Sequence, residues 1–175
     1  MRSNVLSLKQ LLPILRKLKK QGKRIAFTNG CFDLLHIGHL TYLERIKKRA
    51  DILVVAVNSD SSVRGLKGAG RPVVPAAERA RMVAALKPVD FVTIFQEPTP
   101  LKVIRAVRPD LLAKGGDWRP DRIVGAEVVK SYGGRVAVIP YVAGHSTTCL
   151  AEKLGVSFST VSRWLSGKTK PQKVQ

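Results

Sequence analysis

Cysteine and long apolar runs are both scarce in this sequence, and each scarcity excludes a class of protein. Only two cysteines, Cys31 and Cys149, occur among the 175 residues. Because they form no CxxC pair and no Cys/His spacing, they predict neither a disulfide framework nor a zinc site. Pro13 and Arg16 interrupt the N-terminal apolar stretch, so we expect neither a signal peptide nor a membrane span. Free thiols in a reducing cytoplasm are the simplest interpretation.

Acidic side chains are scarce as well. The sequence has 12 aspartate and glutamate residues against 31 lysine and arginine residues, which gives a formal net charge of +19. Residues 1–23 contain no acidic side chain. An excess this large suits an anionic partner, which could be a nucleotide, a nucleic acid or a membrane surface. The net charge alone does not distinguish between these partners. The alternative to an anionic partner is a solvated basic surface that has no function.

Residues 1–23 predict an N-terminal amphipathic helix. Its apolar stripe recurs at helical spacing and consists of Leu8, Leu11, Leu12, Leu15 and Leu18. Basic residues occupy most of the other face. Pro13 should kink this helix or mark its start. A leucine stripe of this kind is usually part of a core, so we expect it to pack against the main domain rather than lie on a membrane surface.

Apolar and amphipathic runs alternate along the remainder of the chain. Strands are predicted at residues 24–28, 52–57, 91–95, 111–113 and 136–139. Helices are predicted at residues 39–50, 75–86, 99–107, 121–132 and 149–154. This alternation predicts an α/β fold with a Rossmann-like, doubly wound parallel five-stranded sheet that carries helices on both faces.

The same patterns divide the chain into three parts. We expect residues 1–23 to form the N-terminal helix, residues 24–154 the main domain, and residues 155–175 a C-terminal helical extension with a basic tail. Within the main domain, residues 61–75 contain three glycines among basic and hydroxyl side chains. This composition predicts a mobile loop that attracts anions.

The most informative stretch is residues 27–39, with the sequence FTNGCFDLLHIGH. It starts where the first predicted strand ends and leads into the first helix of the main domain. His36 and His39 are three residues apart at the helix start, so both imidazoles can face a ligand at its positive end. Gly38 lets a bulky anion approach the backbone, and free N–H groups at a helix start suit phosphate. Two ordinary structural histidines are the alternative.

Polar residues follow three further predicted strands, at residues 58–60, 114–117 and 145–148. In a doubly wound sheet the carboxyl ends of the strands meet at one rim, where ligands bind. Ser146, Thr147 and Thr148 stand at a predicted helix start and offer hydroxyl and N–H groups to phosphate. Taken alone, these segments could be a plain helix cap and a tight turn, but together with residues 27–39 they indicate a ligand site.

The motifs resemble those of the HxGH nucleotidyltransferase superfamily, and residues 24–154 most resemble the heptose 1-phosphate adenylyltransferase family. The matching pieces are residues 27–33, 36–39, 57–60, 71–72, 90, 99–100, 114–118 and 146–148. The resemblance implies that ATP and heptose 1-phosphate give ADP-heptose, a surface-polysaccharide precursor, and pyrophosphate. It also implies Mg²⁺ bound with ATP and a homodimer. In many bacteria this unit follows a sugar kinase; none is present here, so we expect a stand-alone transferase.

The resemblance implies a role for each residue of these motifs. The catalytic residues would be His36, His39 and Lys114. The nucleotide would contact Phe27, Thr28, Asn29, Gly30, Cys31, Phe32, Gly38, His39, Ser146, Thr147 and Thr148. The sugar phosphate would contact Asp33, Asn58, Asp60, Lys67, Arg71, Gly115, Gly116 and Asp117. Lys67 would close over the phosphates, and Asp33 and Asp117 could orient substrate hydroxyls or a metal. We expect no dedicated metal cage. His145 departs from the arginine that the family often has there.

The C-terminal tail resembles a different family. Residues 150–167 look like a helix-turn-helix of the phage-repressor type, with Ala151, Gly155 and Val161 at the positions that let two helices cross. The residues that would face DNA are Ser157, Ser159, Thr160, Ser162 and Arg163. A helical hairpin packed on the transferase is the alternative, and we expect a disordered tail at residues 168–175.

Two other functions of the protein remain open. One is a cytidylyltransferase acting on a polyol or glycerol phosphate, and the other is a DNA-binding regulator.

Overall fold

A parallel five-stranded sheet is the framework of the chain in the computed structural model. The structure describes residues 4–68, 70–116, 118–119, 122–140, 160 and 163. The strands are β1 (Ile25–Gly30), β2 (Ile52–Asn58), β3 (Phe91–Phe95), β4 (Leu111–Gly115) and β5 (Arg135–Ile139). Their order in the sheet is β3-β2-β1-β4-β5, and all four pairs are parallel. The chain reverses its direction of winding between β3 and β4, which confirms the doubly wound α/β fold.

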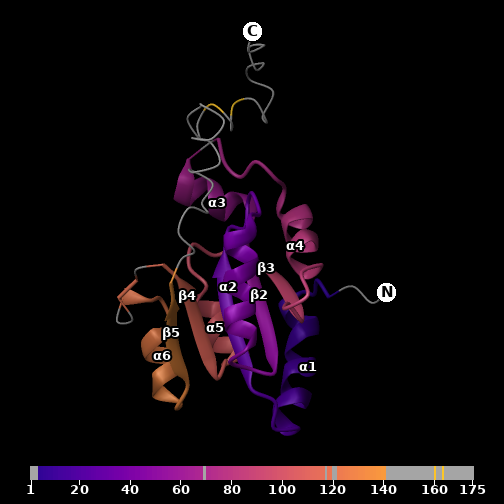
Figure 1. Cartoon of the computed structure of the whole chain (residues 1–175), viewed down its shortest axis with the longest axis vertical. Coiled ribbons are helices and arrows are strands. Elements are labelled where there is room, and N and C mark those ends of the chain that lie inside the picture. The colour runs from indigo at the N-terminus through magenta and orange to yellow at the C-terminus, as the bar shows by residue number, and fades with distance from the viewer. Residues whose placement is uncertain are drawn as a thin grey trace.

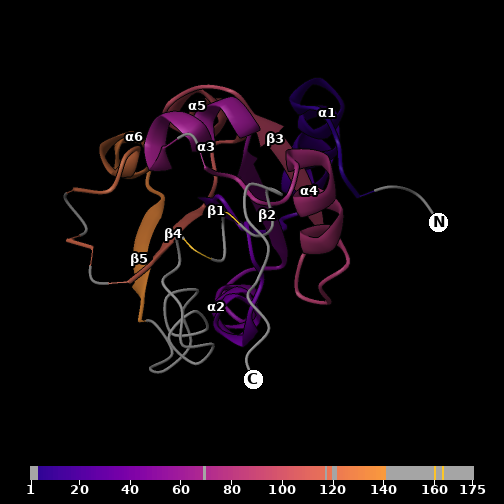
Figure 2. The same ribbon diagram turned by 90° about the horizontal axis from the view of Figure 1, so that it is seen from above.

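Helices cover both faces of this sheet (Figure 2). One face carries α1 (Leu8–Lys20), α5 (Leu101–Val107) and α6 (Ala126–Ser131), and the other carries α2 (Ile37–Lys47) and α4 (Ala76–Ala84). A further helix, α3 (Asp60–Lys67), lies beyond the carboxyl ends of the strands (Figure 1). Among the described residues, no helix has both the length and the apolar character needed to cross a bilayer.

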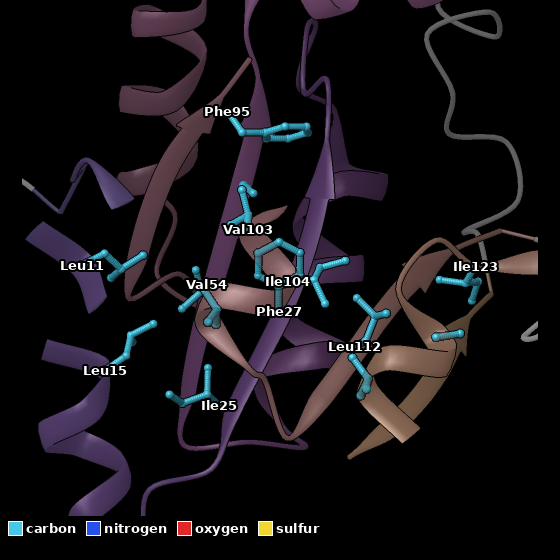
Figure 3. Close-up of a cluster of buried hydrophobic side chains, with 14 residues drawn as sticks. Leu11, Leu15, Ile25, Phe27, Val54, Phe95, Val103, Ile104, Leu112 and Ile123 are labelled. Atoms are coloured by element: carbon cyan, nitrogen blue, oxygen red, sulfur yellow. The ribbon is translucent and has the colours of Figure 1, made fainter. Parts of the chain in front are cut away.

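Alternate side chains of each strand supply two separate cores. Phe27 and Val54 point into the core beneath α1, α5 and α6, where Figure 3 shows them among side chains from these helices. Ala26 and Leu53 point into the core beneath α2 and α4. Because both faces are buried, β1 and β2 read as continuous apolar runs rather than alternating ones. This burial on both faces fixes the register of the strands, and therefore the position of the polar residues that follow them.

Helix α1 packs against the main domain, as its leucine stripe predicts. Leu11 and Leu15 are almost fully buried. Ser7 caps the helix start through Gln10, whose backbone N–H donates to Ser7 Oγ at 3.3 Å. Pro13 lies inside the helix and does not mark its start. The cost is one lost backbone hydrogen bond, which the burial of the leucines on either side offsets.

The prediction of a loop over residues 61–75 is wrong for its first half, which forms α3. Ser59 caps this helix by accepting a hydrogen bond from the Ser62 N–H at 3.2 Å. Val63, which belongs to the helix, is fully buried. Capping and burial therefore outweigh the low helix propensity of Gly65. Helix α6 begins at Ala126 rather than at residue 121, and α5 follows Pro100, without a side-chain cap from Thr99. The predicted helix 149–154 lies outside the described residues, as does the C-terminal extension except for residues 160 and 163.

Candidate active site

The carboxyl ends of β1, β2 and β4 line a cleft of about 610 Å³. The structure brings together many of the predicted site residues around this cleft: Asn29, Gly30, Cys31, Phe32, Asp33, His39, Asn58, Lys67, Arg71, Lys114 and Gly115. Among the described residues, other predicted members do not line it: Phe27, Thr28, His36, Gly38, Asp60 and Gly116. Asp117, Ser146, Thr147 and Thr148 lie outside the described residues.

Phe27 and Thr28 are placed in the interior of the protein. Both are fully buried. Phe27 belongs to the core beneath α5, and the Thr28 hydroxyl lies 2.7 Å from the Tyr42 hydroxyl. Their side chains therefore tie β1 to its surroundings, and the polar part of the predicted motif that faces the cleft begins at Asn29.

The two motif histidines meet at the start of α2. His36 is the N-cap residue, and its backbone N–H donates to Nδ1 of His39 at 3.3 Å. The two ring centroids are 4.0 Å apart. Burial, with smaller contributions from the nearby His36 and Lys67, lowers the pKa of His39 to about 4. At neutral pH, His39 is therefore uncharged, and with Nδ1 acting as acceptor its proton is on Nε2. Lining the cleft, His39 can donate a hydrogen bond to a phosphate oxygen.

The loop before α2 holds this histidine in place. Phe32 has a φ of +47°, an uncommon value for a residue with a large side chain, and is 5% exposed. Its ring centroid lies 5.5 Å from that of His39. A Cβ atom on Gly30 would lie only 3.1 Å from Phe32 Cε2, so the glycine makes room for this ring. Gly30 thus acts through Phe32 on the position of His39.

Lys114, near the end of β4, is one of the cations that line the cleft. Its Nζ donates to Asn29 Oδ1 at 3.0 Å, and burial lowers the pKa of its ammonium group while Cys31 opposes this shift. The hydrogen bond joins the carboxyl ends of the adjacent strands β1 and β4. A partly desolvated, preorganised ammonium group interacts more strongly with a phosphate than a fully hydrated one.

Asp33 and Arg71 form a nearly buried ion pair. Their side chains are 3% and 10% exposed, and Arg71 Nε lies 2.9 Å from Asp33 Oδ2. The same carboxylate accepts hydrogen bonds from the backbone N–H groups of Val73 and Val74, both at 2.9 Å to Oδ1. Asp33 therefore ties the segment after α3 to the motif loop, and both of its oxygens have protein partners. A substrate contact by Asp33, as the sequence predicts, would have to share these oxygens.

Arg79 has a central position that the sequence analysis missed. It is fully buried, donates to the carbonyl groups of Val74 and Asn58 at 2.7 and 2.8 Å, and pairs with Asp60 at 2.7 Å. Its third nitrogen donates to the carbonyl of Cys31. Arg79 thus joins the motif loop, the end of β2 and the start of α4. Arg79 precedes Val83 by four residues and therefore lies on the same, apolar face of α4. This spacing is the one sequence feature that could have indicated that Arg79 is buried.

No dedicated metal cage is present in the part of the chain that the structure describes. No group of three or more histidine, cysteine, aspartate or glutamate residues there could hold an ion. The arrangement offers instead a neutral histidine donor, a partly buried lysine and a helix start around one cleft. These groups can position an anionic substrate and stabilise charge on phosphoryl oxygens.

Comparison with known families agrees with this geometry. Residues 27–148 match the model of the family described as cytidylyltransferase-like, and residues 149–173 match a helix-turn-helix model. The chain is 53% identical over 152 residues to the bifunctional protein HldE of Geotalea uraniireducens (strain Rf4), and 51% identical over 150 residues to that of Methylobacillus flagellatus. These alignments cover 87% and 86% of this chain but only 31% of each relative, so the chain spans about a third of their length.

Solved structures show the same fold. The lipopolysaccharide core biosynthesis protein from Thermoplasma volcanium GSS1 is 30% identical, with a TM-score of 0.56 over 69% of this chain and 98% of that one. Pantoate-beta-alanine ligase from Francisella tularensis is 16% identical, with a TM-score of 0.58 over 86% of this chain and 76% of that one. The second likeness concerns the fold alone.

Proposed function

The chain belongs to the cytidylyltransferase-like family, and from this premise we propose that it transfers the adenylyl group of ATP to a heptose 1-phosphate, giving ADP-heptose and pyrophosphate. The observation that carries the proposal is the neutral His39 at the start of α2, which faces a cleft that Lys114 also lines. The resemblance of residues 24–154 to the heptose 1-phosphate adenylyltransferases supplies the substrate class.

The proposed reaction is a single displacement at phosphorus. A phosphate oxygen of the sugar 1-phosphate attacks the α-phosphorus of ATP, and the bond from that phosphorus to the oxygen bridging to the β-phosphorus breaks. Pyrophosphate leaves with the bonding electrons, and no covalent enzyme intermediate forms. The protein contributes position and charge stabilisation. His39 donates from Nε2 to a phosphoryl oxygen, while Lys114 and Lys67 offset charge on the phosphates.

Mg²⁺ enters this scheme with ATP rather than through a protein cage. Mg²⁺ prefers several water ligands and substrate phosphates, and among the described residues no group of three or more histidine, cysteine, aspartate or glutamate side chains could hold it. When bound, Mg²⁺ would neutralise charge on the phosphates. We propose that the reaction takes place in the cytoplasm, where ATP is supplied. We also expect the protein to be a homodimer, which light scattering on the purified protein would test.

Product analysis tests the proposed reaction. The protein is incubated with ATP or CTP, Mg²⁺ and either heptose 1-phosphate or glycerol 3-phosphate, and the products are identified by mass spectrometry. We expect an ADP-sugar with heptose 1-phosphate and no nucleotide adduct of glycerol phosphate. The variant Glu127→Gln, changed at an exposed ion pair on α6, is the control for any site variant in this assay and should form the same product as the parent protein. Formation of CDP-glycerol from CTP, without any ADP-sugar, would instead support the alternative of a cytidylyltransferase acting on a polyol or glycerol phosphate.

The match of residues 149–173 to a helix-turn-helix family favours a second function, binding of DNA. Serine, threonine and arginine side chains in this stretch would contact the duplex, and the net charge of +19 would attract it. Fluorescence anisotropy with a labelled duplex of about three helical turns tests this proposal. Affinity should fall steeply between 50 and 200 mM salt, by roughly tenfold or more if several phosphates are contacted. Binding that Arg163→Glu leaves unchanged would count against this function.

A further inference from the structure

Three large apolar side chains are exposed around the cleft. Leu66, Trp118 and Val124 are 59%, 50% and 45% exposed, and all three line it. Single exposed apolar side chains are ordinary, but several that converge on one cleft indicate a binding surface. An indole that is half exposed has much apolar area available for contact with a ligand. None of these three residues has a role in the chemistry described above.

Described residues before and after Trp118 are tied to the sheet and to the core. Before it, the Gly116 N–H donates to the carbonyl of Ile139 in β5 at 3.0 Å. After it, Ile123 is 5% exposed within the core, and Gly125 lies against Ile104 so closely that an added Cβ would approach to 2.7 Å. Val124, between these two residues, is thereby presented to the cleft. Because its two neighbours are held in place, less entropy is lost when a ligand contacts Val124.

The lining of the cleft differs in polarity from one part to another. The segment after β4 contributes Trp118, Ile123 and Val124, together with one charged residue, Arg122. The ends of β1 and β2 and the segment after α3 contribute Asp33, Asn58 and Arg71, which are polar. A sugar phosphate carries many hydroxyl groups and suits the polar part. A purine base has two flat apolar faces and suits the part beside an exposed indole.

We infer that Trp118 is the stacking surface for the base of the nucleotide, with Val124 bordering it. This inference deepens the proposed function and rests on it, because the base would be the adenine of ATP. Stacking between a base and an aromatic side chain changes affinity by roughly 5- to 150-fold. The two-ring adenine covers more of the indole than a one-ring pyrimidine does, so Trp118 favours ATP over CTP.

Tryptophan fluorescence tests this assignment without requiring turnover. The chain has two tryptophans, and Trp164→Phe leaves Trp118 as the only one in the full-length protein. ATP should quench its emission, whereas tripolyphosphate, which lacks the base, and heptose 1-phosphate should not. Quenching by tripolyphosphate to the same extent, or by heptose 1-phosphate instead of ATP, would overturn the inference. ATP binding measured by calorimetry without any quenching would overturn it as well.

Two substitutions provide a kinetic test. Trp118→Ala should raise the KM for ATP by about 5- to 150-fold with a much smaller change in kcat and in the KM for the sugar phosphate. Trp118→Phe should restore most of the affinity. Met82→Ala, at an exposed apolar residue on α4, is the control and should change neither constant. A rise confined to the KM for the sugar phosphate would place the sugar against the indole and refute the assignment.

The two proposals fail in distinguishable ways. Quenching of Trp118 by ATP together with no transfer to heptose 1-phosphate would overturn the proposed reaction and leave the base site intact. Transfer with unchanged ATP kinetics in Trp118→Ala would overturn the base site and leave the reaction intact. Absence of ATP binding by calorimetry would overturn both.

Discussion

Replacing Asp33 with asparagine should destabilise the protein far more than its small size suggests. The carboxylate accepts N–H groups from Val73 and Val74 and pairs with Arg71, and it is 3% exposed. Asparagine keeps one oxygen for the N–H groups of Val73 and Val74 but turns an NH₂ group toward the guanidinium of Arg71. The charge pairing between Asp33 and the nearly buried Arg71 is lost. We expect a loss of about 2–4 kcal/mol in the free energy of unfolding.

Urea denaturation at pH 7, followed by circular dichroism, measures this loss. A domain of this size has a total stability of roughly 5–15 kcal/mol, so the variant should still fold in the absence of urea. Glu127→Gln removes a carboxylate charge from an exposed pair, with side chains 81% and 50% exposed, and should change stability by less than about 0.5 kcal/mol. If Asp33→Asn were no more destabilising than this control and raised only the KM for the sugar phosphate, Asp33 would be a substrate ligand rather than a tie between loops.

Three further predictions concern the motif itself. His39→Ala should lower kcat by about two orders of magnitude with an unchanged circular dichroism spectrum, as expected for loss of one preorganised donor; near-full activity would show that the donor is not needed. His39 has its pKa lowered from 6.5 to about 4, so the unfolded chain takes up a proton more readily than the folded protein. Acidification from pH 7 to pH 5 should therefore lower the free energy of unfolding of the parent protein by about 2 kcal/mol more than that of His39→Gln. Urea denaturation of both proteins at both pH values measures this difference. Equal losses in the two proteins would contradict the lowered pKa of His39. Gly30→Ala should displace the Phe32 ring and destabilise the protein by roughly 1–3 kcal/mol, whereas a thermal midpoint equal to that of the parent protein would show that the loop adapts without cost.

The strands and the histidine motif could be predicted because their signals are local. Apolar runs buried on both faces identify β1 and β2, and the pair of histidines after β1 marks the start of α2. The carboxyl ends of parallel strands then bring Asn29, Asn58 and Lys114 to one cleft by topology alone. For the five strands, only the exact bounds differ from the prediction.

The missed features depend on contacts between segments far apart in the sequence. Arg79 is surrounded by groups from residues 31 to 74, and nothing in its own neighbourhood shows that three carbonyl groups would converge on it. Trp118 belongs to a matching motif, but the sequence alone does not show that its side chain is half exposed beside the cleft. Helix α3 was mistaken for a loop because the burial of Val63 is a tertiary effect.

Initial rates of pyrophosphate release test the central claim most directly. The protein is assayed with heptose 1-phosphate and Mg²⁺, with ATP and CTP in parallel reactions. Release with ATP and not with CTP is the result that an adenylyltransferase with a purine-stacking Trp118 predicts. Release with CTP and not with ATP would retain the displacement at phosphorus but contradict both the adenylyl transfer and the base site. No release with either nucleotide would contradict the proposed reaction itself.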